Sequence, residues 1–464
     1  MKQKEICFKS LVTVALLGAS VASLFSADVK TVQDSSENKV VVKEVVVNEV
    51  NENKKPKFKF YGFVRNYFIY DSRQNYQSSE GLYNQIPKDE NLNPLGEDLN
   101  DISSSKFLAM TSRLGVDVSG IKAFNADLSA KIETDFCGFS SSATMLRIRQ
   151  AYVKMKWEKN ALLLGQTWHP MSSDLPDVLG LASGSPFHPF SRTPQIRYDF
   201  SLSKIRFTLA ALWQFQYKSV GPDGADTKYL NHSILPEFYI GFDLFNKKGF
   251  QIGTGLDIVR LRPRTTATEY FVSGQDTTTG KDIYSSFTKK VDETFLSTSP
   301  VLFLNYKKEK FLMRFRTTYA RSTTHLNMMS GYGVTGVDEE TGVREYSPLR
   351  SLSSWINFSY GKDLKFNLFG GYVKNFGLEK ELVKIVNPDG KSENNLYTRS
   401  NVSNIDCIYR IAPAVSYTMK RMTFGVEYEW TTVSYGDGYN EFAEVEGLRT
   451  ISNHRVCGLI RYSW

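Results

Sequence analysis

The last ten residues alternate between two kinds of side chain, and the chain ends on an aromatic residue. Val456, Gly458, Ile460, Tyr462 and Trp464 occupy one set of positions, and Arg455, Cys457, Leu459, Arg461 and Ser463 occupy the other. One apolar face and one largely polar face suit a strand that lies between lipid and a water-filled lumen. A terminal indole is a liability in a soluble domain, because termini fray and expose it. The pattern therefore predicts a last strand that spans a membrane.

The same period of two recurs along the chain from Lys57 onward. A soluble β-sandwich or propeller is the alternative, but it would have to bury the row Asp127, Ser129, Lys131, Glu133 and Asp135, which a barrel lumen accommodates. Clear alternation occupies Leu108–Ser119, Ala126–Phe136, Lys204–Gln216, Phe238–Phe245, Phe250–Val259, Phe311–Ala320, Phe366–Val373, Met422–Thr431 and Val456–Trp464.

The links between these strands alternate in length, as the short turns and long loops of outer-membrane barrels do. Short turns are expected near 120–124, 157–161, 202–204, 246–249, 307–310, 361–364 and 418–421. Longer links are expected at 72–105, 170–193, 218–233, 263–293, 322–350, 377–404 and 436–449, and a shorter eighth one near 138–143. This arrangement predicts an all-β fold, a transmembrane antiparallel β-barrel of about 16 strands with both ends on the short-turn side. A barrel of that size encloses an aqueous channel.

Composition agrees with a barrel that has a thin apolar outer band and a wet interior. The chain has 464 residues, of which 13% are aromatic, yet its mean hydropathy is −0.32. After the N-terminus there is no apolar run of about 18 residues, so transmembrane helices are not expected. The net charge of +8 is spread over turns, loops and the inferred lumen. Because no basic stripe forms, nucleic acid is not expected as a partner.

The N-terminal residues are expected to direct export. Lys2, Lys4 and Lys9 precede an apolar stretch, which predicts a signal peptide over residues 1–27, with cleavage after Ala22 or alternatively after Ala27. Residues 28–56 are expected to form a periplasmic segment and residues 57–464 the barrel. The Val-rich centre of the periplasmic segment fits a short helix, a strand, a linker or a short trimerising coil, and is too short for the plug of an energised importer.

Cysteine and histidine usage gives no support for a metal site, a cofactor or an enzyme. Cys407 and Cys457 fall on opposite faces of their strands, so both are expected to be free thiols. Neither a CxxC motif nor a His/Cys cluster is present. The five histidines show no spacing typical of a Ser/His/Asp or paired-carboxylate site, so a barrel hydrolase is not expected.

The link that begins at His169 differs from the other long links. It carries Pro170, Pro176, Pro186 and Pro189, and it includes the apolar residues Val178, Leu179 and Leu181. Prolines stiffen a loop by fixing φ, and apolar residues favour burial. We therefore expect this third long loop to fold inward against the wall and narrow the pore, with Asp174 and Asp177 near the constriction. The alternative is a loop that packs on its neighbours or on a trimer partner.

The first third of the barrel carries motifs that resemble the DcaP-like trimeric outer-membrane porins of Gram-negative bacteria. These motifs are Phe60-Tyr61-Gly62-Phe63-Val64-Arg65, Ser112-Arg113-Leu114-Gly115, Leu146-Arg147-Ile148-Arg149-Gln150-Ala151-Tyr152-Val153, Leu164-Gly165-Gln166-Thr167-Trp168, Leu175-Pro176-Asp177 and Arg192-Thr193-Pro194-Gln195-Ile196-Arg197-Tyr198. The terminal aromatic likewise resembles the C-terminal signal of outer-membrane barrels. The resemblance implies a homotrimeric, sixteen-stranded diffusion channel with its third loop at the constriction and a preference for small anions such as dicarboxylates.

The charges on the inferred inward face agree with that preference, because basic residues outnumber acidic ones at mid-height. A charge that faced lipid would cost about 2–4 kcal/mol, so these side chains are expected to face the lumen. The facing is least certain where Gln150 would point outward beside Arg149. The alternative for each arginine is a salt bridge within the wall. The expected pore-lining and constriction residues are Arg65, Arg113, Lys131, Glu133, Arg147, Arg149, Asp174, Asp177, Arg314, Arg316, Arg410 and Arg455.

Two further expectations concern partners. Ala126 and Ala130 are small residues on the outward face of one strand, where subunits of a trimer could approach closely, with lipid contact as the alternative. The lipid bilayer and small anionic solutes are the other expected partners. A nonspecific or sugar-selective porin is the alternative function, although few aromatic residues face inward.

Overall fold

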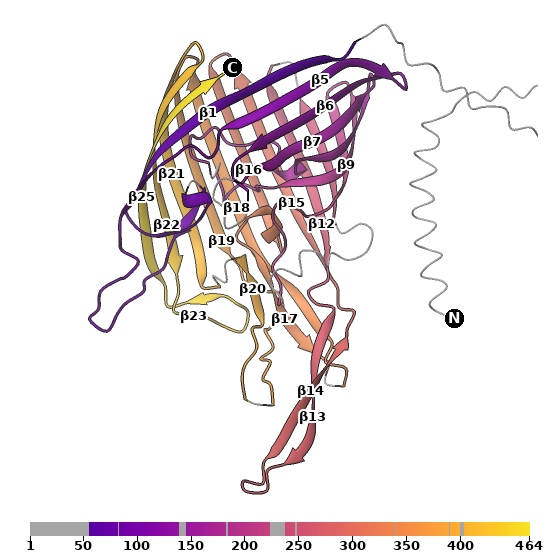
Figure 1. Ribbon diagram of the computed structural model, residues 1–464, viewed down its shortest axis with the longest axis vertical. Coiled ribbons are helices and arrows are strands. Elements are labelled where there is room, and N and C mark those ends of the chain that lie inside the picture. Colours follow the sequence, from indigo (N-terminus) through magenta and orange to yellow (C-terminus); the bar gives the residue numbers. More distant parts are fainter. Residues whose placement is uncertain are drawn as a thin grey trace, which may run out of the picture. The chain divides into compact units, whose positions relative to one another are not determined.

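The computed structural model describes residues 55–81, 83–138, 145–181, 184–222, 237–245, 248–338, 340–388, 390–399 and 403–464. The expected signal peptide and all but the end of the segment 28–56 lie outside these residues. The described chain forms a closed antiparallel barrel whose long loops gather at one end (Figure 1). Among the residues that the structure describes, no helix is long and apolar enough to cross a membrane.

The main sheet has 19 strands, of which β4 (Ser104–Leu108), β17 (Gly331–Val337) and β20 (Leu396–Thr398) are short additions. The other sixteen form the wall, as expected from the sequence. They are β1 (Lys57–Asp71), β5 (Arg113–Ala123), β6 (Ala126–Asp135), β7 (Arg147–Lys156), β8 (Asn160–Trp168), β9 (Arg192–Leu202), β10 (Ile205–Leu212), β11 (Glu237–Phe245), β12 (Phe250–Leu261), β15 (Phe295–Lys308), β16 (Phe311–Arg321), β18 (Arg344–Gly361), β19 (Leu364–Asn375), β21 (Ile405–Met419), β22 (Met422–Tyr435) and β25 (Arg449–Ser463).

The first and last strands close the barrel. Strands β1 and β25 pair antiparallel with Phe63 opposite Ser463, and the Trp464 amide donates to the Gly62 carbonyl at 3.2 Å. Gly62 also lies close to β5, because a Cβ added there would lie 2.6 Å from the Arg113 carbonyl oxygen. A glycine is thus required where the terminal indole packs over the seam.

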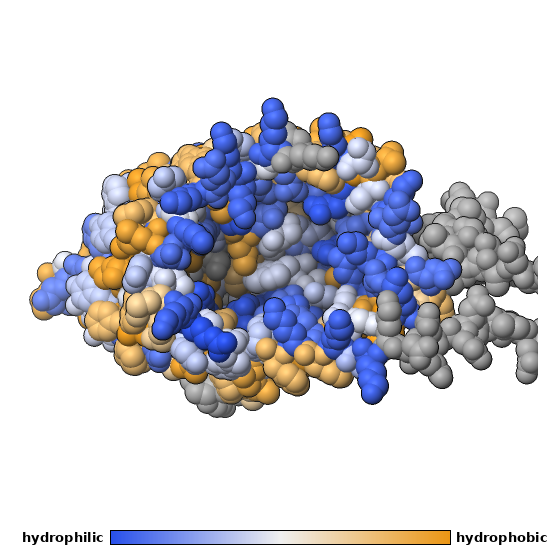
Figure 2. Space-filling view, turned by 90° about the horizontal axis from the view of Figure 1, so that it is seen from above, coloured by the Kyte–Doolittle hydropathy of each residue, from blue (hydrophilic) through white to orange (hydrophobic). Residues whose placement is uncertain are grey.

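Burial along the strands follows the predicted alternation. In β22, Phe424, Val426 and Tyr428 are exposed on the outer face, whereas Glu427 and Glu429 are buried on the inner face. Figure 2 looks along the barrel from the short-turn end, where hydrophilic residues surround a central hollow and hydrophobic residues lie on the outside. Since an apolar outer band with a polar interior is what a bilayer requires of a barrel, the facing of the charged side chains follows from the fold.

The second wall strand differs from the expected continuous alternation over Leu108–Ser119. Strand β4 pairs with the C-terminal part of β1, residues 67–71, and strand β5 pairs with its N-terminal part, residues 57–63. The second wall strand is therefore interrupted at residues 109–112. The interruption is filled by side-chain hydrogen bonds, since the Arg65 amide donates to Ser112 Oγ at 3.1 Å. Local hydrogen bonding by serine and threonine competes with the ladder, which explains why the strand breaks here.

The long loops carry additional short strands and turns. Strands β2 (Asn75–Ser78) and β3 (Tyr83–Pro87) pair within the first loop, and β13 (Thr266–Gln275) and β14 (Asp282–Lys290) form a hairpin that projects from the barrel (Figure 1). The remaining elements are β23 (Gly438–Tyr439), β24 (Val445–Glu446) and the single 3-10 turns η2 (Ser79–Gly81), η3 (Pro170–Ser172) and η5 (Thr324–Leu326).

Candidate functional site

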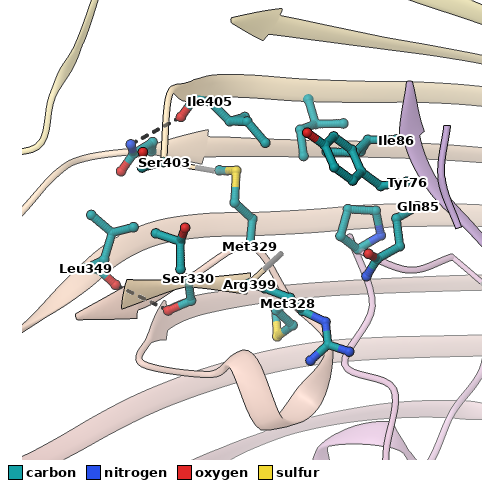
Figure 3. A pocket seen from close by; sticks show the side chains of 14 residues that line it. Tyr76, Gln85, Ile86, Met328, Met329, Ser330, Leu349, Arg399, Ser403 and Ile405 are labelled. Atoms are coloured by element: carbon teal, nitrogen blue, oxygen red, sulfur yellow. Dashed lines mark hydrogen bonds between the residues drawn. The ribbon is translucent and has the colours of Figure 1, made fainter. Parts of the chain in front are cut away.

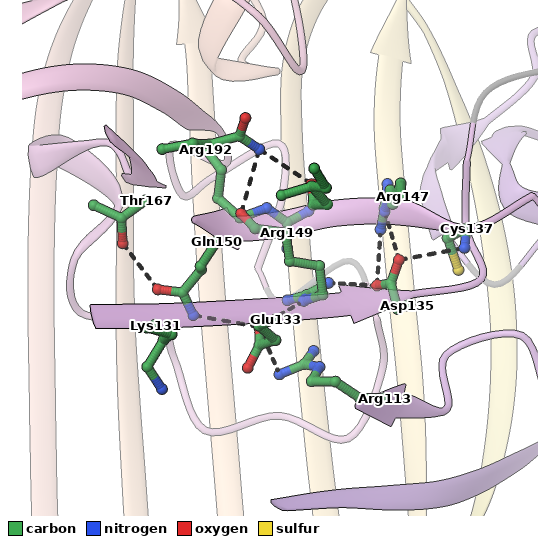
Figure 4. Close-up of polar contacts among 12 residues, drawn as sticks. Arg113, Lys131, Glu133, Asp135, Cys137, Arg147, Arg149, Gln150, Thr167 and Arg192 are labelled. Carbon is green, nitrogen blue, oxygen red and sulfur yellow. Dashed lines mark hydrogen bonds and ion pairs between the residues drawn. The ribbon is translucent and has the colours of Figure 1, made fainter. Parts of the chain in front are cut away.

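The inner face of β5, β6 and β7 carries a network of ion pairs (Figure 4). Asp135 accepts from Arg147 Nε and Arg149 Nη1, each at 2.6 Å, and Glu133 accepts from Arg149 Nε at 2.9 Å. Arg149 and both carboxylates are buried. Removing one partner of a buried ion pair leaves an uncompensated buried charge and is strongly destabilising. These four side chains therefore stabilise the wall.

A β-bulge explains the facing that the sequence left least certain. Glu133 pairs with Gln150 and the next residue, Thr134, pairs with Ile148, so Arg149 is an extra residue in β7. The bulge re-aims side chains. Arg149 and Gln150 consequently both reach Glu133, Gln150 with its Nε2 at 3.3 Å, and the expectation that Gln150 points outward is wrong.

A second group of cations gathers around the ring of Phe63, which faces inward from β1. The guanidinium carbons of Arg65, Arg113 and Arg461 lie 4.8, 5.0 and 6.0 Å from the ring centroid. Among the described residues, Arg113 is the member of this group that forms an ion pair, with Glu133 at 3.5 Å. We call Arg65, Arg113 and Arg461 the three-arginine cluster.

The register of the barrel places two of these arginines directly opposite each other. Arg65 on β1 pairs with Arg461 on β25, and Phe63 pairs with Arg113 on β5. Like charges at directly opposed positions destabilise a sheet. Arg461 is absent from the residues expected from the sequence, although its place on the polar face of the last strand was the signal for it. Next to this cluster, Lys131 pairs with Asp117 at 2.9 Å and donates to the Tyr61 hydroxyl at 3.1 Å.

The third long loop, residues 169–191, is hydrogen-bonded to inward-facing side chains of three strands. The Asp177 amide donates to Asn357 Oδ1 of β18 at 2.8 Å. The amides of Leu179 and Gly180 donate to the two Glu427 oxygens of β22 at 2.8 and 2.9 Å. The hydroxyl of Tyr67 on β1 donates to the Leu179 carbonyl at 2.8 Å.

Three of the expected pore arginines also hold this loop, by donating to its backbone carbonyls. Arg314 Nη1 donates to Leu175 at 2.8 Å, Arg316 Nη1 to Met171, and Arg410 Nη1 to Ser185 at 3.0 Å. Arg316 and Arg410 are each 2% exposed, whereas Arg314 is half-buried. Arg314 is therefore accessible to solvent, whereas the two buried side chains are not.

The two expected constriction acids of the loop are both paired. Asp174 lies 3.4 Å from Arg316 Nη2. Asp177 forms an ion pair with Lys365 of β19, a residue that was not singled out in the sequence. The acids of the loop are thus partly neutralised, which lessens their repulsion of anions.

Arg455 contacts the first long loop rather than the third. Its side chain is buried, its Nη2 donates to the Gly81 carbonyl, and its Nε lies 3.8 Å from Asp71. The sequence could predict that Arg455 faces inward, but the first loop that covers it has no periodic pattern to reveal its path.

His188 of the third loop is enclosed by protein. Its ring packs edge-on against Trp355 with 5.2 Å between centroids. Burial holds the pKa of His188 well below its ordinary value, and the positive charge of Arg316 acts in the same direction. The imidazole therefore stays neutral at neutral pH.

A small apolar cavity marks the place where the third loop meets its neighbours (Figure 3). It measures about 40 Å³ and is lined by residues such as Ile86, Pro186, Met328, Met329 and Leu349. Ser330 Oγ beside it donates to the Leu349 carbonyl at 3.3 Å. The cavity is a seam between packed loops, and its apolar lining suits loop packing rather than a hydrophilic solute.

The described cysteines are free thiols. Cys137 and Cys457 are buried and Cys407 is half-buried, and none forms a disulfide. This agrees with the opposite faces expected for Cys407 and Cys457.

The chain is similar to known outer-membrane proteins in part of its sequence and in its fold. The model of the DcaP outer membrane protein family matches residues 30–217. No curated protein matches the sequence. The crystal structure of the outer membrane channel DcaP of Acinetobacter baumannii matches with a TM-score of 0.57 and 17% identity, over 88% of this chain and 97% of that one.

Two further solved barrels are similar at lower scores. Outer-membrane expressed OmpT of Vibrio cholerae matches with a TM-score of 0.46 and 12% identity, over 90% of this chain and 100% of that one. Salmonella typhi OmpF matches with a TM-score of 0.44 and 11% identity, over 88% of this chain and 97% of that one. The resemblance to the DcaP outer membrane protein family, inferred from the motifs, is confirmed over residues 30–217 by the family model, and the DcaP channel structure shares the fold of the barrel.

Proposed function

We propose that this protein is an outer-membrane porin through which small hydrophilic solutes diffuse, with a preference for anions such as dicarboxylates. The observation that carries the preference is the three-arginine cluster around Phe63. Its charges face the lumen, and Glu133, the acid paired with Arg113, is shared with Arg149.

The chemistry of the cluster suits a carboxylate. Arg65 and Arg461 oppose each other across the β1–β25 seam, and an anion between them would relieve their repulsion. Guanidinium groups hold carboxylates by paired, charge-assisted hydrogen bonds. Rings of basic side chains lower the barrier for anions in a pore. A dicarboxylate could use two guanidinium groups at once.

The third loop is proposed to form the constriction. Its backbone bonds to Asn357, Glu427 and Tyr67 support a path across the interior, since all three side chains face inward from different parts of the wall. The three-arginine cluster adjoins this path, because Arg65 lies 5.1 Å from the ring of Tyr67. Solutes would then pass between the loop and a basic wall.

Reversal potential in a planar bilayer under a salt gradient tests the preference. The wild-type channel is expected to be anion-selective, and Arg65→Gln/Arg461→Gln to lower the anion-to-cation permeability ratio. A unit charge at about 4 Å is worth about 1 kcal/mol in water, so the ratio should fall by roughly fivefold or more. Lys122→Gln/Lys310→Gln removes the same charge at the short-turn end of the barrel, near the end of β5 and in the turn before β16, and should leave the ratio near wild type. Cation selectivity of the wild type, or an unchanged ratio in the arginine variant, would refute the proposal.

Export and assembly complete the proposal. Residues 1–27 are proposed to be removed as a signal peptide, which N-terminal sequencing of the outer-membrane protein would test.

The porin is proposed to be a homotrimer, and native mass spectrometry in detergent should detect three chains. Ala130 on the outer face of β6 is half-buried, but Ala126 is 1% exposed and is covered within its own chain. Ala126 is therefore not proposed as a trimer contact.

A further inference from the structure

We propose that His169, Glu237, Asp257 and His325 bind one divalent transition-metal ion of the zinc class, a site that lies outside the porin function. Each residue offers one ligand atom, and these four atoms all lie within 4.8 Å of one another. All four side chains have no exposed surface. We call these residues the His–carboxylate cluster.

The fold brings the cluster together from four separate parts of the chain. His169 begins the third long loop directly after β8, and His325 lies in η5 of a later long loop. Glu237 and Asp257 point inward from the adjacent strands β11 and β12, where Glu237 pairs with Val259 and Asp257 with Tyr239. The two carboxylates are therefore diagonal neighbours on one face, a spacing within reach of each other.

The charge of the cluster points to a cation. Two buried carboxyl groups lie beside an apolar cluster that includes Met171, Leu212 and Leu326. In the described chain, neither oxygen of Asp257 has a hydrogen-bond partner, and Glu237 Oε2 has none either. Burying unpaired carboxylate oxygens is strongly unfavourable unless a cation or proton compensates them.

The arginine of this region does not supply that compensation. Arg316 donates to the Met171 carbonyl and pairs with Asp174 at 3.4 Å, and both of these partners belong to the third loop. The two Asp257 oxygens lie 3.8 and 3.9 Å from the imidazole nitrogens of His169 and His325, beyond hydrogen-bond distance.

Distances within the cluster approach those of a tetrahedral site. His169 Nε2 lies 2.5 Å from a Glu237 oxygen and 3.8 Å from an Asp257 oxygen. His325 Nε2 lies 3.2 Å from Glu237 and 3.9 Å from Asp257. Zinc bonds of about 2.0–2.2 Å at tetrahedral angles place ligand atoms about 3.3–3.6 Å apart. Small side-chain shifts therefore suffice.

The donor set selects the class of metal. Two imidazoles with two carboxylates suit zinc and its neighbours in the first transition row, whereas calcium and magnesium prefer oxygen ligands alone. The Met171 amide donates to His169 Nδ1 at 3.2 Å, so in the absence of metal the proton of that imidazole sits on Nε2. Metal binding at Nε2 places the proton on Nδ1, which can then no longer accept from the Met171 amide, so this hydrogen bond is exchanged for the metal bond. Affinity should therefore fall as pH is lowered, because protons compete for the ligands.

A bound metal would tie the third loop to the wall. His169 is the first residue of that loop, Glu237 and Asp257 belong to the barrel, and His325 lies in another long loop. One ion would thus fix two loops and two wall strands at a single point, where two buried carboxyl groups otherwise lie side by side.

Metal content of the full-length protein, purified without a histidine tag, tests the site. After treatment with EDTA, incubation with Zn²⁺ and desalting, mass spectrometry should find about one zinc ion per chain, as a four-ligand site implies. Glu237→Gln/Asp257→Asn preserves shape and should bind none. His454→Gln, on the outer side of the barrel, is the matched control and should bind as wild type does.

Thermal unfolding of the same samples is the second measurement. Zn²⁺ should raise the Tm of wild type and of His454→Gln, and leave the Tm of Glu237→Gln/Asp257→Asn unchanged. A wild type that retains no zinc would overturn the inference, as would a carboxamide variant that binds as much zinc as wild type. If the variant fails to fold, His325→Ala is measured in its place, with the same expected loss of zinc.

Discussion

Replacing Glu427 by glutamine is the sharpest test of the proposed constriction. Its carboxylate accepts from the consecutive amides of Leu179 and Gly180, at 2.8 and 2.9 Å. Glutamine keeps one acceptor oxygen and places an NH2 group against the other amide, so at least one of these hydrogen bonds is lost. Leaving that loop amide without its partner costs about 1–3 kcal/mol. The population in which the loop tip has left the wall should therefore rise by roughly 5- to 150-fold.

The rest of the loop should stay in place in this variant, because Arg314, Arg316 and Arg410 bind other carbonyls of it. Single-channel recording in a planar bilayer is the assay. Glu427→Gln is expected to show a larger mean conductance and more frequent current fluctuations than wild type. Asp243→Asn, which removes an inward carboxylate that pairs with Arg206 on the wall, is the control and should leave both unchanged. Conductance and noise equal to wild type in Glu427→Gln would show that the loop does not restrict the pore.

Three smaller perturbations test the packing of the barrel. Gly62→Ala should destabilise the barrel by about 1–3 kcal/mol through overpacking, because its Cβ would lie 2.6 Å from the Arg113 carbonyl oxygen. Gly274→Ala is the control and should leave the stability unchanged, because its Cβ would have no neighbour within 4 Å. Arg410→Met removes a buried guanidinium that pairs with an inward glutamate and should cost about 3–5 kcal/mol in urea unfolding. Cys457 is buried, so a maleimide should label it only after unfolding, and rapid labelling of folded protein would contradict its placement.

The facing of the strands was predictable because a period of two fixes it. Where a strand has no bulge, one aromatic assigned to lipid fixes the facing of every second residue, so Arg65, Arg113 and Arg461 could be placed inside from sequence alone. At the bulge in β7 the rule fails, and the facing of Gln150 was not predictable. The strand number was predictable because short and long links alternate. The break in the second strand was not, since the hydrogen bonds of Ser112 and Thr111 to Arg65 depend on the neighbouring strand.

The partners of the inward charges were not predictable either. Whether Arg316 faces water or a loop carbonyl depends on the path of a loop with no period. The His–carboxylate cluster is a similar case, because Glu237 is 68 residues from His169 and 88 from His325. Motif spacing detects metal sites only when the ligands lie close together in sequence. The absence of a CxxC motif or a His/Cys cluster from the sequence therefore carried no weight against a site that the fold assembles.

The seam between β1 and β25 joins the first and last strands of the barrel wall, and the three-arginine cluster straddles it. Arg65 belongs to β1 and Arg461 to β25, so the cluster comes into being only when these two strands pair. Any anion that binds there recognises a finished barrel and has no site on an open intermediate. By mass action such a ligand would favour completed channels over incomplete ones during assembly. Selectivity and quality control would then depend on the same pair of arginines.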